Sequence, residues 1–192
     1  MVRSGRAGGP PRGLSIRPSA EDDLAMIQAI YAHHVLHGLA SFEEEPPSLA
    51  EIAARRRAIL ARGLPHLVAA AAGRVLGYAY AGPYRPRPAY RFTLEDSIYL
   101  APEMTGRGIG GRLLAELIER ATALGYRQMI AVIGDSAHRP SILLHERAGF
   151  AHVGVLRAVG FKFGRWVDTV LMQRALGPGA SAPSEGRGAD LG

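Results

Sequence analysis

Residues 104–111 read Met104-Thr105-Gly106-Arg107-Gly108-Ile109-Gly110-Gly111, between an apolar run that ends at Leu100 and a long helical pattern that starts near Gly108. A glycine-rich turn that opens a helix directs several free backbone N–H groups toward one place. The positive end of the helix dipole lies behind them, so such a turn favours an anion. The anion that this turn binds would indicate both the fold and the function of the protein.

The segments on both sides of the turn have clear periodicity. Downstream, residues 108–124 predict a helix that Gly125 ends, with apolar residues on one face. That face consists of Leu113, Leu114, Leu117, Ile118 and Ala121. Upstream, residues 91–100 predict a strand, so the turn joins a strand to a helix.

The rest of the chain predicts an α/β fold with a mixed central sheet flanked by helices, in the order β-α-α-β-β-β-α-β-α-β-β. Ser19 and Ser48 are the expected N-caps of the first two helices, and Ala72-Gly73-Arg74 is a hairpin signal. The further strands are expected at 14–17, 66–72, 75–82, 128–133, 153–161 and 166–173, and a short helix at 140–148. Residues 84–90 contain two prolines and predict a loop.

Length and composition indicate one domain over residues 14–176, with disordered tails at 1–13 and 177–192. The sequence has no cysteine, which excludes disulfides and thiolate chemistry. No apolar run is long enough to span a bilayer, and we expect a cytoplasmic protein without a membrane partner. The net charge of +6 suits a small anionic ligand better than nucleic acid.

Three interpretations of the turn compete. Gly106, Gly108 and Gly111 match the dinucleotide-binding fingerprint, and Asp135 follows at a suitable distance. That fingerprint normally follows the first strand of its domain directly, whereas about 90 residues of other structure precede this turn. A Walker phosphate loop is excluded because no Gly-Lys-Ser/Thr follows. The third interpretation is a plain tight turn before a helix.

Four stretches in order resemble the GNAT superfamily of N-acetyltransferases, and within it the phosphinothricin and methionine sulfone/sulfoximine acetyltransferases. They are Thr93-Leu94-Glu95-Asp96-Ser97-Ile98-Tyr99-Leu100, Thr105-Gly106-Arg107-Gly108-Ile109-Gly110, Pro140-Ser141-Ile142-Leu143-Leu144-His145-Glu146-Arg147-Ala148-Gly149-Phe150 and Gly160-Phe161-Lys162-Phe163-Gly164-Arg165-Trp166-Val167-Asp168. The resemblance covers nearly the whole expected domain and implies the GNAT fold.

The resemblance identifies the anion as the pyrophosphate of acetyl-CoA, the co-substrate. The implied cofactor-binding residues are Ile98, Tyr99, Leu100, Thr105, Gly106, Arg107, Gly108, Ile109, Gly110, His138 and Ser141. Two positions depart from the family pattern, which usually has Arg or Gln in place of Thr105 and Asn in place of His138. We expect a small loss of affinity at Thr105, and the role of His138 stays open.

Acetyl transfer to an amine needs a base, and the resemblance assigns that role to Glu95. A solvated strand carboxylate is the alternative interpretation. His145 is the second catalytic candidate, for orienting the thioester or the base, and its alternative is a histidine satisfied by packing. His33 and His37 have the spacing of metal ligands, but no third ligand accompanies them, so no metal is expected.

The acceptor-binding residues that the resemblance implies are Phe42, Arg85, Arg87 and Tyr90. A pair of guanidinium groups can bind an α-carboxylate in bidentate fashion, although both arginines could equally be solvated. The family is dimeric, so we expect a homodimer. The hairpin with Lys162 and Trp166 is a candidate for its interface or for a contribution to the neighbouring site. The alternative interpretation is that the two are ordinary core and surface residues.

The sequence therefore predicts an N-acetyltransferase that transfers acetyl from acetyl-CoA directly to the α-amino group of phosphinothricin, methionine sulfoximine or methionine sulfone. One alternative is acetylation of a protein N-terminus or a polyamine, although polyamine sites prefer acidic pockets. Another is a non-catalytic acyl-CoA sensor. A nucleic-acid binder is disfavoured because the basic residues are not interleaved with aromatic ones.

Overall fold

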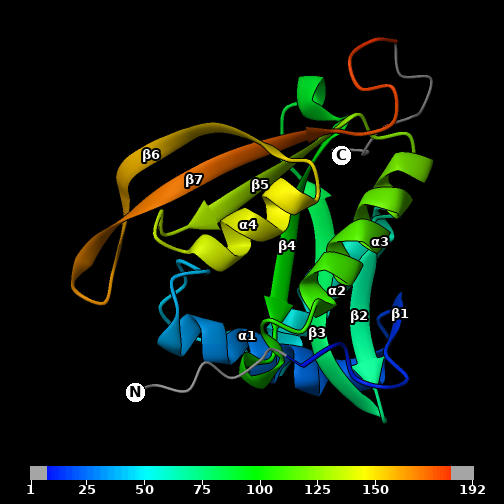
Figure 1. Cartoon of the computed structure of the whole chain (residues 1–192), viewed down its shortest axis with the longest axis vertical. Coiled ribbons are helices and arrows are strands. Elements are labelled where there is room, and N and C mark those ends of the chain that lie inside the picture. Colours follow the sequence, from blue (N-terminus) through cyan, green and yellow to red (C-terminus); the bar gives the residue numbers. More distant parts are fainter. Residues whose placement is uncertain (1–7, 183–192) are drawn as a thin grey trace.

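A seven-stranded mixed sheet, in the order β1-β2-β3-β4-β5-β7-β6, runs through the computed structural model, which describes residues 8–182 (Figure 1). The strands are β1 (Ser15–Pro18), β2 (His66–Ala71), β3 (Arg74–Pro83), β4 (Thr93–Leu100), β5 (Gln128–Gly134), β6 (Ala151–Lys162) and β7 (Arg165–Ala175). The α-helices are α1 (Leu24–His37), α2 (Leu49–Ala61), α3 (Ile109–Ala123) and α4 (Arg139–Arg147). Short 3-10 turns occupy Glu21–Asp23, Pro88–Tyr90 and Pro102–Met104. The predicted order of elements is confirmed.

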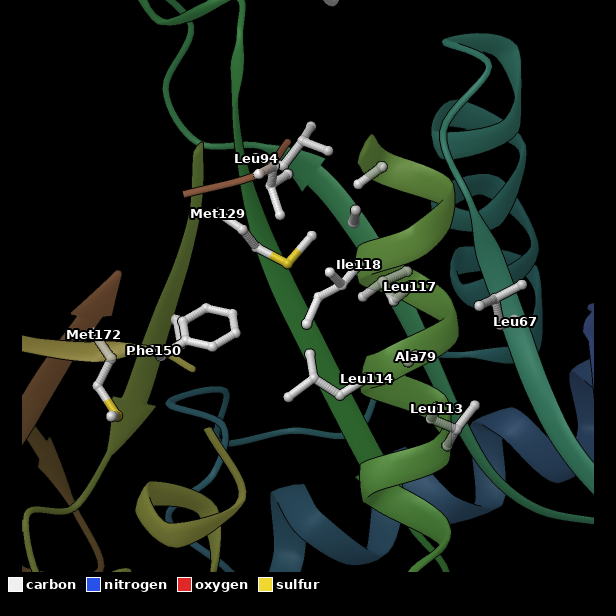
Figure 2. Close-up of a cluster of buried hydrophobic side chains, with 14 of the residues drawn as sticks. Leu67, Ala79, Leu94, Leu113, Leu114, Leu117, Ile118, Met129, Phe150 and Met172 are labelled. Carbon is white, nitrogen blue, oxygen red and sulfur yellow. The ribbon is translucent and has the colours of Figure 1, made fainter. Parts of the chain in front are cut away.

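The helices cover both faces of the sheet (Figure 1). The apolar face of α3 is buried, as predicted, and Figure 2 shows Ile118 directed toward Met129 of β5, with Leu114 one turn away on the same face of the helix. Helices α1 and α2 pack on the other face in a second cluster of buried side chains, which includes Val35. The two clusters hold the central strands between them.

Strands β4 and β5 run parallel and separate part of the way along. They pair from Thr93–Gln128 to Asp96–Ala131, whereas β4 pairs with β3 as far as Leu100. Beyond Ala131, β5 continues in pairing with β7. The edge of β4 at residues 97–100 is therefore not covered by a neighbouring strand on the β5 side.

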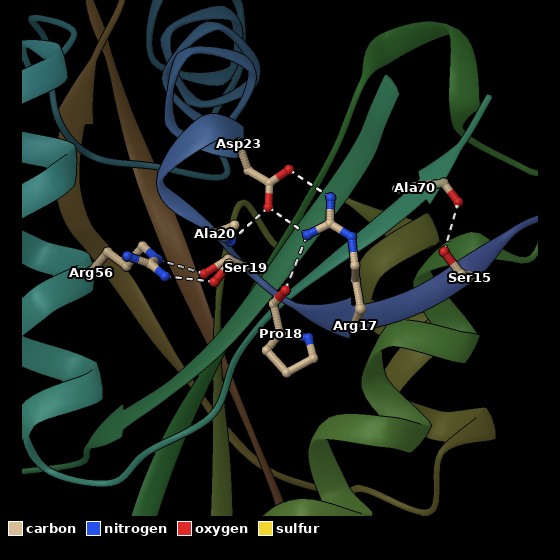
Figure 3. Close-up of polar contacts among 8 residues, drawn as sticks. All are labelled: Ser15, Arg17, Pro18, Ser19, Ala20, Asp23, Arg56 and Ala70. Atoms are coloured by element: carbon tan, nitrogen blue, oxygen red, sulfur yellow. Dashed lines mark hydrogen bonds and ion pairs between the residues drawn. The ribbon is translucent and has the colours of Figure 1, made fainter. Parts of the chain in front are cut away.

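One predicted helix start is wrong. Ser48 caps α2, since its hydroxyl accepts a hydrogen bond from Glu51 N–H at 3.1 Å, as expected. Ser19 does not cap the first helix, because Arg56 of α2 donates to both its hydroxyl and its carbonyl (Figure 3). The Asp23 carboxylate instead accepts from Ala20 N–H and from the Arg17 guanidinium. A tertiary contact has thus replaced the local capping pattern.

The structure describes only part of the two expected tails. Residues 1–7 and 183–192, on which much of the two expected tails falls, lie outside the described residues. Leu176 is completely buried and donates its N–H to the Arg127 carbonyl, and residues 177–182 after it form turns. Leu176 therefore belongs to the buried core, and the domain bounds stay a prediction.

Candidate active site

The gap that opens between β4 and β5 is the centre of the candidate site. Backbone groups of residues 97–100 border it, and Ile98, Tyr99 and Leu100 of the predicted cofactor strand belong to this segment. The Leu100 carbonyl accepts a hydrogen bond from His34 Nε2 of α1 at 2.8 Å. Burial lowers the pKa of His34, which keeps the ring neutral and consistent with this single donated bond.

The glycine-rich turn leads from this strand edge into α3. Gly106 and Gly108 both have a φ of +75°, a conformation that L side chains rarely adopt. The first helical amide to bond inside α3 is that of Arg112, to Gly108, so the preceding amides are free to point out of the helix start. The turn thus has the conformation of an anion site.

The side chains of the turn contribute less than its backbone. Thr105 donates its hydroxyl to the Pro102 carbonyl at 2.8 Å, and Ile109 is completely buried in the core. Arg107 is half-buried, and Gly110 is buried against Leu144 of α4. Any ligand of this turn would therefore meet mainly backbone N–H groups.

Glu95 lies in β4 just before the gap, with Gly82 of β3 and Ile130 of β5 as its neighbours across the sheet. Burial raises the pKa of Glu95 to about 7, and the charge of Asp96 adds to this, while the charge of Arg85 acts in the opposite direction. A carboxyl group with this pKa exchanges its proton near neutral pH. The predicted base therefore has the acidity that the role requires.

Asp96 and His145 form a buried pair behind Glu95. Neighbouring residues of a strand point to opposite faces, so the Asp96 carboxylate faces α4, where His145 Nε2 lies 3.0 Å from Oδ2. His145 Nδ1 donates to the Ser141 carbonyl at 2.8 Å. Burial opposes protonation, but the hydrogen bond and charge of Asp96 outweigh it and raise the pKa of His145.

The pair gives His145 a structural setting, in which the Ser141 carbonyl is one of its two hydrogen-bond partners. Both ring nitrogens are engaged and the residue is buried, on the face of the sheet opposite to Glu95. Asp96 was not singled out from the sequence, where it read as a neighbour of Glu95. A second carboxylate in a strand that is buried on both faces needs a buried partner, which is the signal that could have found it.

The loop at 84–90 approaches Glu95 from the start of β4. Tyr84 N–H donates to the Thr93 carbonyl, and the Arg85 guanidinium lies 5.1 Å from the Tyr84 ring. Tyr90 meets Tyr84 edge to face, with the ring centroids 5.7 Å apart. Arg85 and Arg87 are exposed. Tyr84, which the sequence did not single out, orders this loop.

A shallow groove of about 250 Å³ runs from this loop across β5 toward β7. Tyr84, Tyr90 and Thr93 form one side, and Ile130, the partner of Glu95, lies in its floor. The groove is mostly apolar, with Arg85 next to Tyr84 at its edge. It could receive the body of a small molecule whose charged groups reach Arg85 and Glu95.

Phe42 and His138 lie toward the other end of the site. Phe42 contacts Gly134, the last residue of β5, which is four residues, or about 13 Å, beyond Ile130. His138 is exposed before α4 and is close enough to His34 for its charge to lower the pKa of that ring. The predicted acceptor residues are thus not one cluster, because Phe42 and the arginine loop lie on opposite sides of Glu95.

Within residues 8–182, no group of three potential metal ligands comes together. No helix in this part of the chain is long and apolar enough to cross a membrane.

The fold and the site define the class of the protein. Residues 27–150 match the acetyltransferase (GNAT) family model, and the chain belongs to this family of N-acetyltransferases. It is 56% identical to phosphinothricin N-acetyltransferase of Alcaligenes faecalis over 165 residues, which cover 86% of this chain and 84% of that protein. It is 45% identical to an L-methionine sulfoximine/L-methionine sulfone acetyltransferase of Pseudomonas paraeruginosa, with coverages of 88% and 98%.

Among solved structures, the chain is similar to a GNAT superfamily phosphinothricin acetyltransferase from Sinorhizobium meliloti in complex with acetyl-CoA. The TM-score is 0.88 at 50% identity, and the match covers 92% of this chain and 95% of that one. The predicted family and fold are confirmed, and the dinucleotide-binding alternative is excluded.

Proposed function

We propose that this acetyltransferase transfers acetyl from acetyl-CoA to the α-amino group of phosphinothricin, methionine sulfoximine or methionine sulfone, with Glu95 as the general base. The relatives named above act on acceptors of this class. The observation that carries the proposal is the half-buried Glu95, whose pKa is raised to about 7, between the arginine loop and the separated strands. The acceptor would lie in the groove next to Ile130.

In this proposal Glu95 takes a proton from the acceptor ammonium or amine, directly or through one water. Its raised pKa makes it a better base than an ordinary glutamate. Arg85, which is close enough to Glu95 to lower its pKa, binds the α-carboxylate next to the amino group, and Arg87 adds a second positive charge. A ligand bound this way has its amine directed at Glu95.

The residues present fit acetyl-CoA, which supplies an acetyl thioester when bound. The amides of residues 106–110, which precede the first hydrogen bond inside α3, would hold its pyrophosphate, as the backbone conformation allows. The exposed edge of β4 at residues 97–100 offers backbone groups to the pantetheine amides. His138 would lie along the same path, near His34.

The test is an acceptor panel with purified protein, in which release of CoA from acetyl-CoA is followed. We expect saturable turnover with at least one of the three amino-acid analogues, and kcat/KM at least ~100-fold lower with spermidine and with a peptide that has a free N-terminus. Comparable turnover of spermidine or the peptide would contradict the acceptor class. Binding of acetyl-CoA without turnover of any acceptor would identify a sensor instead.

The proposal includes a homodimer that forms through the β6–β7 arm. This hairpin exposes a row of apolar side chains, with Val159, Phe161, Phe163 and Trp166 each more than half exposed. Exposed apolar side chains that lie together on a surface are typical of an interface between proteins. A second copy is the partner we propose for it.

The proposal also includes a cytoplasmic location and detoxification of the acceptor. Acetylation removes the positive charge of the α-amino group, through which an amino-acid analogue is recognised by other proteins. The acceptor panel would rank the candidate toxins by kcat/KM.

A further inference from the structure

The tip of the β6–β7 hairpin holds the segment that carries Phe42. Lys162 is the last residue of β6, and its Nζ donates to the carbonyls of Gly38 at 3.0 Å and Ser41 at 2.7 Å. More than 120 positions of sequence separate Lys162 from this segment. The contact therefore joins the α1–α2 connection to the far end of the hairpin.

The environment of Lys162 is unusual for a lysine at a hairpin tip. The residue is only 2% exposed, and burial lowers the pKa of its amine. Its partners are backbone carbonyls rather than a carboxylate, with the Phe163 ring 5.0 Å from Nζ. A buried charge with such partners disfavours folding by its desolvation, so its effect is to fix the geometry of the segment it binds.

A second set of contacts fixes the same segment from the helices. Tyr31 of α1 lies 2.9 Å from the Ser41 hydroxyl and donates to Glu43 at 2.9 Å, and Arg55 of α2 pairs with Glu43. Residues 38–43 are thus held between the helices and the hairpin.

Phe42 projects from this segment into a space that a glycine creates. A Cβ atom at Gly160 of β6 would lie 2.8 Å from Phe42 Cδ2 and Cζ and closer still to Cε2. The ring also contacts Gly134, the end of the strand whose residue Ile130 is the partner of Glu95. The hairpin therefore positions Phe42 in two ways. Lys162 holds the backbone next to Phe42, and Gly160 leaves room for its ring.

We infer that Lys162 is a positioning residue that fixes Phe42, which bounds the acceptor site at the end opposite to the arginine loop, and thereby determines which acceptors bind. The inference rests on the proposed function for the acceptor, and it assigns Lys162 no contact with the reacting atoms. Two different substitutions should then both displace Phe42. Lys162→Met removes both donated bonds, and Gly160→Ala displaces the ring while leaving Lys162 in place.

Gly154→Ala is the matched control for Gly160→Ala. Gly154 lies in the same strand, and a Cβ atom there meets nothing within 4 Å among the described residues. Light scattering on each variant must show the same oligomeric state as for the wild type, since all three positions lie in the arm.

The first readout is hydrogen exchange of the amides at residues 38–43, which does not depend on activity. Loss of two charge-assisted hydrogen bonds should speed exchange roughly tenfold or more in Lys162→Met. Exchange at the wild-type rate would overturn the inference.

The second readout is the KM for acceptor and for acetyl-CoA. Lys162→Met and Gly160→Ala should each raise the KM for acceptor by about tenfold and change the ranking of acceptors, with little effect on the KM for acetyl-CoA. Gly154→Ala should match the wild type. An unchanged acceptor KM in Gly160→Ala would overturn the role of Phe42 in bounding the acceptor site. Absence of turnover in the wild type would contradict the proposed function alone, because exchange tests the Lys162 contacts independently.

Discussion

Glu95 and Asp96 are neighbouring carboxylates in β4, and their side chains point to opposite faces of the sheet. Glu95 faces the gap and the arginine loop, where burial raises its pKa to about 7. Asp96 faces α4 and pairs with His145. The alternation of a β-strand thus separates the proposed chemical role from a structural one, while the charge of Asp96 still acts on Glu95 through the short distance between them.

Arg85 has two separable effects at this scale. Arg85→Met should raise the KM for an amino-acid acceptor by roughly 10- to 100-fold, because a charged hydrogen-bonding partner of the α-carboxylate is lost. It should also move the acid limb of kcat/KM to higher pH, since Arg85 lowers the pKa of Glu95. Steady-state kinetics over a pH series measures both effects.

Arg91→Met is the matched control for Arg85→Met. Arg91 is exposed, its guanidinium lies 4.8 Å from the Phe92 ring, and it donates to the Pro88 carbonyl at 3.2 Å. Its replacement therefore controls for the loss of an arginine that contacts the same loop but has no assigned contact with the acceptor. An Arg85→Met variant with the kinetics of Arg91→Met would refute the assignment.

Sequence reasoning at the residue scale succeeded where a motif carried the information. The glycine turn and the position of Glu95 follow from quoted motifs, and both have the expected setting in the fold. The partners that come from distant segments could not be predicted, because nothing local connects Asp96 to His145 or Lys162 to Ser41. For the same reason Arg56, far along the chain, removed Ser19 from its expected capping role.

At the scale of elements, α4 is joined to β4 by the Asp96–His145 pair. His145 donates to Asp96 through Nε2 and to Ser141 through Nδ1, which requires a proton on both nitrogens. A neutral imidazole has only one N–H and must release one of these partners. The pair is therefore complete only while His145 is protonated.

This pair predicts a pH-dependent contribution to stability. Because the folded protein raises the pKa of His145, its contribution is full below the unfolded value of about 6.5 and is lost as pH rises through the raised value. His145→Gln should lower the free energy of unfolding by about 3–5 kcal/mol at pH 6, since it leaves Asp96 buried without its partner.

Urea unfolding of both proteins between pH 5.5 and 9 measures this difference. The difference in the free energy of unfolding between wild type and His145→Gln should shrink as pH rises. The titration of Glu95 does not affect this difference, because both proteins contain Glu95. A difference that is constant or grows with pH would rule out the protonated pair.

The periodic elements were the part of the fold most accessible from sequence. The apolar face of α3 and the paired strands of the arm lie close to their expected bounds, because helical and alternating patterns are local. The point at which β4 leaves β5 has no local signature, since Ser97 to Leu100 read as a continuation of the same strand. The separation of β4 from β5 could therefore not be predicted from local patterns, and the cofactor strand was identified only through the family resemblance.

In the whole molecule, the β6–β7 arm extends from the sheet (Figure 1). This arm exposes apolar side chains. Trp166 is 67% exposed and meets Phe161 edge to face at 5.2 Å. We expect light scattering to give a dimer mass for the wild type, and Trp166→Glu to shift it toward the monomer by placing a charge in an apolar interface.

Leu124→Glu provides the comparison for this substitution. Leu124 is 47% exposed at the end of α3, away from the arm, so the same type of change there should leave the mass unaltered. A wild-type protein that is monomeric over the accessible concentration range would contradict the dimer.

The pH dependence of kcat/KM in the wild type and in Glu95→Gln measures whether Glu95 is the general base of acetyl transfer to an amino-acid analogue. The wild-type value should rise with pH through an apparent pKa of about 7. Glu95→Gln should reduce it by roughly 10²–10⁴-fold and remove that limb, while any limb from the acceptor amine persists. Glu119→Gln, at an exposed position of α3, should behave as the wild type. Near-normal activity of Glu95→Gln, or the same acid limb in both proteins, would contradict this role of Glu95.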